Sequence, residues 1–119
     1  MSGFQALPVS EQTWFKNVLG SEVTRFYTEG AVMTVIHGRK GDTVPEHGYS
    51  KGSATYVVSG KVEIDGHVLG AGDAGVYKPG GGFFSVKFLE DSTYVVARVS
   101  DDEITLPDIG ERAAHHLDA

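Results

Sequence analysis

The sequence contains no cysteine among its 119 residues. Disulfide bonds, thiolate metal sites and cysteine nucleophiles are therefore excluded. No uninterrupted apolar stretch approaches the roughly 20 residues that a membrane helix needs, and no basic start followed by an apolar run suggests secretion. We therefore expect a soluble, cytoplasmic protein with no membrane partner.

Positive charge is also scarce. The 10 Lys and Arg residues are outnumbered by 16 Asp and Glu residues, which gives a formal net charge of -6. Nucleic-acid binding needs clustered cations that neutralise phosphate groups. We therefore expect no nucleic-acid partner, and the acidic balance otherwise indicates little beyond solubility.

Glycine, by contrast, is abundant, with 16 residues. A chain of this length is expected to form one domain with a single core that needs no covalent staple. The many glycines imply many turns, and no long helical period appears in the sequence. These features favour an all-β fold.

Short β-prone segments alternate with turn signals along most of the chain. Asp65-Gly66 is a strong hairpin signal, and residues 41–53 are expected to form a loop. Strands at such even spacing are typical of a β-sandwich or barrel. The expected strands are residues 13–20, 23–28, 31–37, 54–59, 61–65, 67–69, 75–78, 83–89 and 93–99.

The stretch from Gly41 to Gly60 resembles the first motif of the cupin superfamily. That motif is a glycine, five residues, His-any-His, three or four residues, Glu, six residues and Gly. Here five residues separate Gly41 from His47. The other positions in the same register are Pro45, where cupins commonly place a proline, Tyr49, Ser53 and Gly60.

The second cupin motif has a partial counterpart. Gly72-Asp73 opens it, with one residue more than usual before Pro79, and Gly81, Phe84 and Phe88 follow. The resemblance implies a cupin jelly-roll barrel, a double-stranded β-helix, over residues 30–99. Residues 1–29 are then an N-terminal arm with edge strands. Residues 100–119 are an acidic tail that forms one helical turn near Glu111–His116 or no fixed structure.

The ligand positions of the motifs are mostly changed. Cupins usually hold a divalent metal with two His and a Glu from the first motif and a His from the second. Carried over position by position, only His47 remains, while Tyr49, Ser53 and Phe84 occupy the other three places. One imidazole cannot hold a metal ion at useful affinity. We therefore expect no cofactor, and any divalent metal would need His47 together with His37 or Glu46.

Two groups of cupins share local features with this chain. The run from His47 to Gly60 looks like small monocupins related to dihydroxyacetophenone dioxygenase. The strands around residues 76–84 and 93–98 look like small metal-free cupins that act as nucleoside phosphorylases.

The resemblance also indicates candidate site residues at the barrel mouth. His47 is either an acid/base group, for which an ordinary pKa near 6.5 is suited, or an inert relic. Tyr49 lies on the same face of an extended segment and could orient a substrate, whereas Glu46 lies on the opposite face. The expected substrate-binding residues are Ser53, Phe84, Tyr77 and His37, while His67 is expected to be solvated beside its turn.

Three functions remain open from the sequence. The first is a metal-poor or metal-free enzyme of isomerase, cyclase or lyase type, with His47 as proton shuttle. The second is a non-catalytic module that binds or senses a small molecule, and the third is a nucleoside phosphorylase-like cupin. In each case we expect a small-molecule ligand and a homodimer that covers exposed edge strands.

Overall fold

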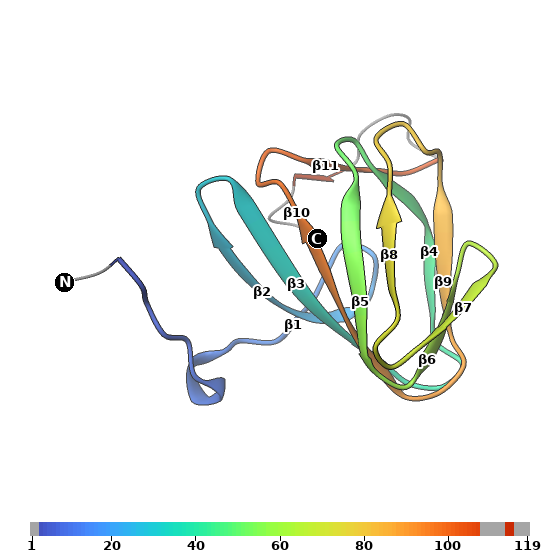
Figure 1. Ribbon diagram of the computed structural model, residues 1–119, viewed down its shortest axis with the longest axis horizontal. Coiled ribbons are helices and arrows are strands. Elements are labelled where there is room, and N and C mark those ends of the chain that lie inside the picture. The colour runs from blue at the N-terminus through green and yellow to red at the C-terminus, as the bar shows by residue number, and fades with distance from the viewer. Residues whose placement is uncertain (1–2, 108–113, 116–119) are drawn as a thin grey trace.

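Two antiparallel sheets of six strands each make up nearly all of the computed structural model, which describes residues 3–107 and 114–115 (Figure 1). The first sheet has the order β1 (Phe15–Lys16), β2 (Glu22–Thr28), β3 (Ala31–Gly38), β10 (Ser92–Arg98), β5 (Ser53–Ser59) and β8 (Ala74–Tyr77). The second has the order β12 (Ala114–His115), β11 (Glu103–Thr105), β4 (Thr43–Tyr49), β9 (Phe84–Phe88), β6 (Lys61–Ile64) and β7 (His67–Gly70). The expected all-β jelly roll is confirmed.

The core lies between the inner faces of the two sheets. In β3, Val32, Thr34 and Ile36 are buried while the residues between them face outward, as the two-residue period of a strand requires. The buried apolar residues that form one cluster are Val23, Ile36, Val44, Tyr49, Val57, Val62, Val86, Phe88, Tyr94, Val96 and Ile104. All of them are β-branched or aromatic, the side chains that pack best on a pleated surface.

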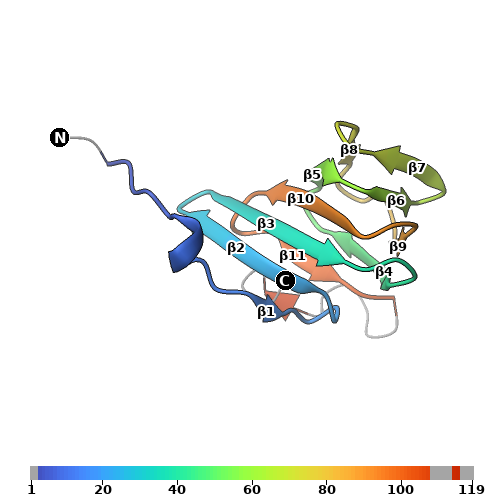
Figure 2. The ribbon, with the colours of Figure 1, turned by 90° about the horizontal axis from the view of Figure 1, so that it is seen from below.

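The N-terminal segment extends away from the sheets in both views (Figures 1 and 2). It contains one short 3₁₀ helix, Val9–Glu11, with no buried residue. Of the expected extended segment 13–20, only Phe15–Lys16 forms a strand, which pairs with β2. No helix in the described ranges combines the length and apolarity that a membrane crossing needs.

The hairpin expected at Asp65-Gly66 is confirmed. Asp65 has a φ of 50° and Gly66 a φ of 80°, the pair of positive angles that a type I′ turn requires. The turn joins β6 to β7, and Lys61 pairs with Gly70 at the other end of this hairpin.

The expectation of a loop over residues 41–53 is wrong for its first half, because β4 occupies Thr43–Tyr49. Proline in the strand concealed it, since Pro45 cannot donate a ladder hydrogen bond. The ladder with β9 accordingly shifts register: Val44 faces Val86, but His47, three residues on, faces Phe84. One extra residue is therefore inserted into β4 as a β-bulge.

The second sheet continues beyond residue 99. Ile104 in β11 is fully buried and pairs with Tyr49 of β4, so this part of the acidic tail belongs to the barrel. The helical turn expected near Glu111–His116 falls mostly outside the described residues. Within it, Ala114–His115 is a strand paired with β11.

Candidate functional site

The bulge in β4 determines which side chains of the first motif enter the barrel. Val44 and His47 would face opposite ways in a regular strand, but the inserted residue turns both inward, and Tyr49 follows two positions later. Glu46 stays exposed, as expected. The His47 and Tyr49 rings lie 5.4 Å apart, edge to face.

Aromatic rings pack around His47 inside the barrel. The Phe84 ring lies 4.5 Å from His47 and 6.1 Å from Tyr49, measured between ring centroids. The Tyr77 ring packs against Phe84, with the two ring centroids 4.8 Å apart. Only about 10 Å³ of space remains beside His47, about the volume that one water molecule needs.

His47 is held in its neutral form. The residue is 2% exposed, and burial lowers the pKa of His47, although the hydrogen bond to Pro45 opposes this and the charge of Arg98 adds to it. The Nδ1 atom lies 2.7 Å from the Pro45 carbonyl oxygen. Because a carbonyl only accepts hydrogen bonds, Nδ1 carries the proton, and Nε2 keeps a lone pair.

A buried ion pair lies beneath Tyr49. The Arg98 guanidinium lies 5.4 Å from the centre of the Tyr49 ring and 3.7 Å from the Asp102 carboxylate. Asp102 is fully buried and also accepts hydrogen bonds from the Ser50 hydroxyl at 2.8 Å and the Lys51 backbone N–H at 2.6 Å. Burial raises the pKa of Tyr49 to about 12, partly opposed by Arg98, so the phenol stays protonated at neutral pH. We call His47, Tyr49, Arg98 and Asp102 the closed centre.

The residues present do not fit a cupin metal. Among residues 3–107, no three His, Asp or Glu side chains lie close enough to share an ion. His47 offers a single nitrogen, and the Phe84 ring packs against it where another ligand would be needed.

The expected approach of His37 to His47 is wrong. His37 is on the outer face of β3, exposed and stacked on Trp14 with ring centroids 4.1 Å apart. Its neighbour Ile36 points into the core, so the alternation of the strand sends His37 outward.

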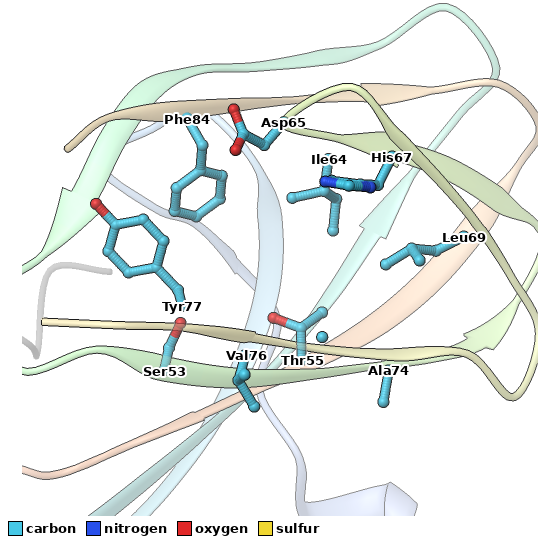
Figure 3. A pocket seen from close by; sticks show the side chains of 11 residues that line it. Ser53, Thr55, Ile64, Asp65, His67, Leu69, Ala74, Val76, Tyr77 and Phe84 are labelled. Carbon is cyan, nitrogen blue, oxygen red and sulfur yellow. The ribbon is translucent and has the colours of Figure 1, made fainter. Parts of the chain in front are cut away.

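A separate cavity of about 370 Å³ opens beside the closed centre (Figure 3). We call it the open cavity. Three expected residues line it: Ser53, Tyr77 and Phe84. The further lining residues are Thr55, Ile64, Asp65, His67, Leu69, Ala74, Gly75 and Val76. His47 and Tyr49 do not line it, and Phe84 touches both regions.

Two titratable groups of the open cavity were not expected there. Asp65 is the first central residue of the type I′ turn and His67 follows the turn; both are exposed, yet both contribute to the wall of the cavity (Figure 3). Burial raises the pKa of the facing Tyr77, and the charge of Asp65 raises it further. The alternation of polar and apolar residues in β6 could have indicated this wall. Val62 and Ile64 face inward, and the turn that follows Ile64 lies at the cavity.

Comparison with solved structures confirms the architecture. An acetylacetone dioxygenase from Acinetobacter johnsonii superposes with a TM-score of 0.72 at 12% identity, covering 96% of this chain and 84% of that chain. KdgF from Halomonas sp. superposes with a TM-score of 0.69 at 21% identity, covering 81% and 93%. An RmlC-like cupin from Shewanella frigidimarina gives 0.69 at 17% identity, covering 83% and 91%.

The chain has the cupin fold. No family model matches the sequence, and no curated protein matches it. At these identities the structural likeness concerns the cupin fold alone.

Proposed function

We propose that this cupin-fold protein binds a small organic molecule in the open cavity. The observation that carries the proposal is the cavity itself: its volume of about 370 Å³ lies within the range of small-molecule sites. Its wall combines apolar side chains such as Ile64 and Leu69 with a few polar groups such as Ser53 and Thr55. This combination is typical of pockets that bind by apolar contact and orient by hydrogen bonding.

An acid/base enzyme is the second candidate, and one observation favours it. The hydrogen bond from Nδ1 of His47 to Pro45 leaves the lone pair on Nε2, as a general base requires. However, Phe84 lies against the His47 ring and the adjoining space holds only about 10 Å³. Catalysis by His47 therefore requires Phe84 to move, whereas binding requires no rearrangement.

Nucleoside phosphorolysis has the least support. Phosphate recognition usually employs Lys or Arg side chains. Among the described residues, neither type lines the open cavity.

A fragment screen by methyl NMR tests the proposed binding. We expect bound fragments to shift the methyl signals of Ile64 and Leu69. Gly75→Leu should abolish these shifts, because the new side chain would occupy the cavity that Gly75 lines. The nearest atom to a Cβ added at Gly75 is Leu69 Cδ1, at 4.0 Å, so the backbone can accept the substitution. Ala54→Leu, on the outer face of β5, is the control that adds the same bulk elsewhere.

The outcomes separate the candidates. Failure of all fragments to shift Ile64 and Leu69, or equal binding to the Gly75→Leu variant, would contradict the proposal. For a fragment that is chemically converted, His47→Ala decides the role of the closed centre. Loss of conversion with retained binding supports the enzyme, and retention of both excludes His47 as its base.

A further inference from the structure

The open cavity has a one-sided charge. Asp65 is the only carboxylate among its lining residues, and no Lys or Arg side chain in the described chain lines it. The protein as a whole carries a formal net charge of -6, so the surrounding field also attracts cations. The wall is therefore suited to a ligand with positive charge rather than one with negative charge.

The Asp65 carboxylate is available to a ligand. It makes no hydrogen bond or ion pair within the part of the chain that the structure describes. Its position is nevertheless defined, because the type I′ turn sets its backbone at a φ of 50° and its N–H donates to the Ser85 carbonyl oxygen at 3.4 Å. Only the side-chain torsions of Asp65 therefore have to be ordered when its carboxylate pairs with a cation.

Two aromatic rings lie beside this carboxylate. Phe84 and Tyr77 are 4.8 Å apart between centroids and tilted by 46°, so they form an angled wall rather than a flat stack. Figure 3 shows the Asp65 carboxylate beside the Phe84 ring, with Ile64 and Leu69 farther along the cavity. Aromatic faces attract organic cations, and the aliphatic side chains offer an apolar surface for the rest of a ligand.

We propose that the open cavity binds an organic cation, namely a small ammonium compound with an apolar or aromatic body. Its charged group lies between Asp65 and the rings of Phe84 and Tyr77, and its body lies against Ile64 and Leu69. This inference rests on the proposed binding function and specifies its ligand class.

The test compares three probes of similar size and shape. They are phenethylammonium, the neutral 2-phenylethanol and the anionic 3-phenylpropanoate, each titrated against the Ile64 and Leu69 methyl signals. We expect the ammonium compound to bind most tightly and the carboxylate least. The ammonium compound should bind about fivefold more tightly than the alcohol, which corresponds to the ~1 kcal/mol of an exposed ion pair. This difference in affinity should decrease in high salt.

Asp65→Asn isolates the carboxylate. Asn-Gly is the preferred sequence of a type I′ turn, so this variant keeps the hairpin and removes only the charge. We expect it to lose the advantage of the ammonium compound and to bind 2-phenylethanol unchanged. Glu63→Gln is the matched control, because Glu63 lies two residues away on the other face of β6 and does not line the cavity.

Three results would overturn this inference: equal or tighter binding of the alcohol or the carboxylate, an equal loss in Glu63→Gln, or no methyl shift with any of the three probes. None of them decides the proposed function. The fragment screen shows separately whether the open cavity binds other classes of molecule.

Discussion

The closed centre and the open cavity lie side by side in one barrel, yet they are built differently. His47, Tyr49, Arg98 and Asp102 are buried, and the Arg98–Asp102 ion pair and the contact of Arg98 with the Tyr49 ring lie within the group. The open cavity carries Asp65 and His67, which are exposed and come from a hairpin turn. The two motif residues His47 and Tyr49 are thus enclosed by other side chains, whereas Asp65 and His67 are open to solvent at the cavity wall.

The largest expected effect concerns the ion pair of the closed centre. Asp102→Ala should destabilise the protein by about 3–5 kcal/mol, because it leaves Arg98 with a buried charge and no carboxylate partner. Urea unfolding measures the change. Asp101→Ala, which breaks the exposed pair with Lys51, should cost less than about 1 kcal/mol. Similar losses in the two variants would contradict the distinction.

Phe84→Ala should open a connection between the closed centre and the open cavity. We expect a loss of about 2–3 kcal/mol in stability from the removed contacts, and entry of water beside His47. Since burial is the main cause that lowers the pKa of His47, this pKa should rise toward its ordinary value. NMR titration of the imidazole Cε1–H signal measures it, with Phe84→Leu as the control that keeps most of the bulk. An unchanged pKa in Phe84→Ala would mean that Phe84 does not separate His47 from solvent.

Gly48 in β4 and Gly75 in the wall of the open cavity differ in how closely other atoms pack around them. A Cβ at Gly48 would lie 2.5 Å from the Gly82 carbonyl oxygen, whereas a Cβ at Gly75 meets nothing closer than 4.0 Å. Gly48→Ala should therefore destabilise the protein by about 2 kcal/mol, and Gly75→Ala should be tolerated. Thermal unfolding of both variants compares them directly. A tolerated Gly48→Ala would show that the loop over β4 can move away.

The smallest expected effect is the contribution of His47 to the pH dependence of stability. Its pKa is lower in the folded than in the unfolded protein, so the unfolded chain binds more protons between the two values. The stabilisation that neutral His47 gives the folded protein is complete above the unfolded pKa near 6.5, and it decreases as the pH falls through the folded pKa. The wild-type protein should therefore lose stability relative to His47→Gln as the pH falls from 7 to 5. A constant difference would contradict the lowered pKa.

Local patterns in the sequence predicted most of the strands. The β-branched run of β10 and the Asp65-Gly66 turn carry their structure in their own residues, since branched side chains favour a pleated strand and this dipeptide tolerates positive φ. β4 and β11 were missed. Pro45 disguises the first, and the second is three residues long and is stabilised by pairing with β4.

The sequence by itself determined the all-β class, the cupin-like motif spacing and the residue types at the motif positions, because these depend on residue identity and short-range periodicity. Only the tertiary structure decided which groups meet. A one-residue bulge turned His47 inward, strand alternation sent His37 outward, and the packing of Phe84 closed His47 off from the cavity. Such placements depend on contacts between strands far apart in the chain, which no local pattern encodes.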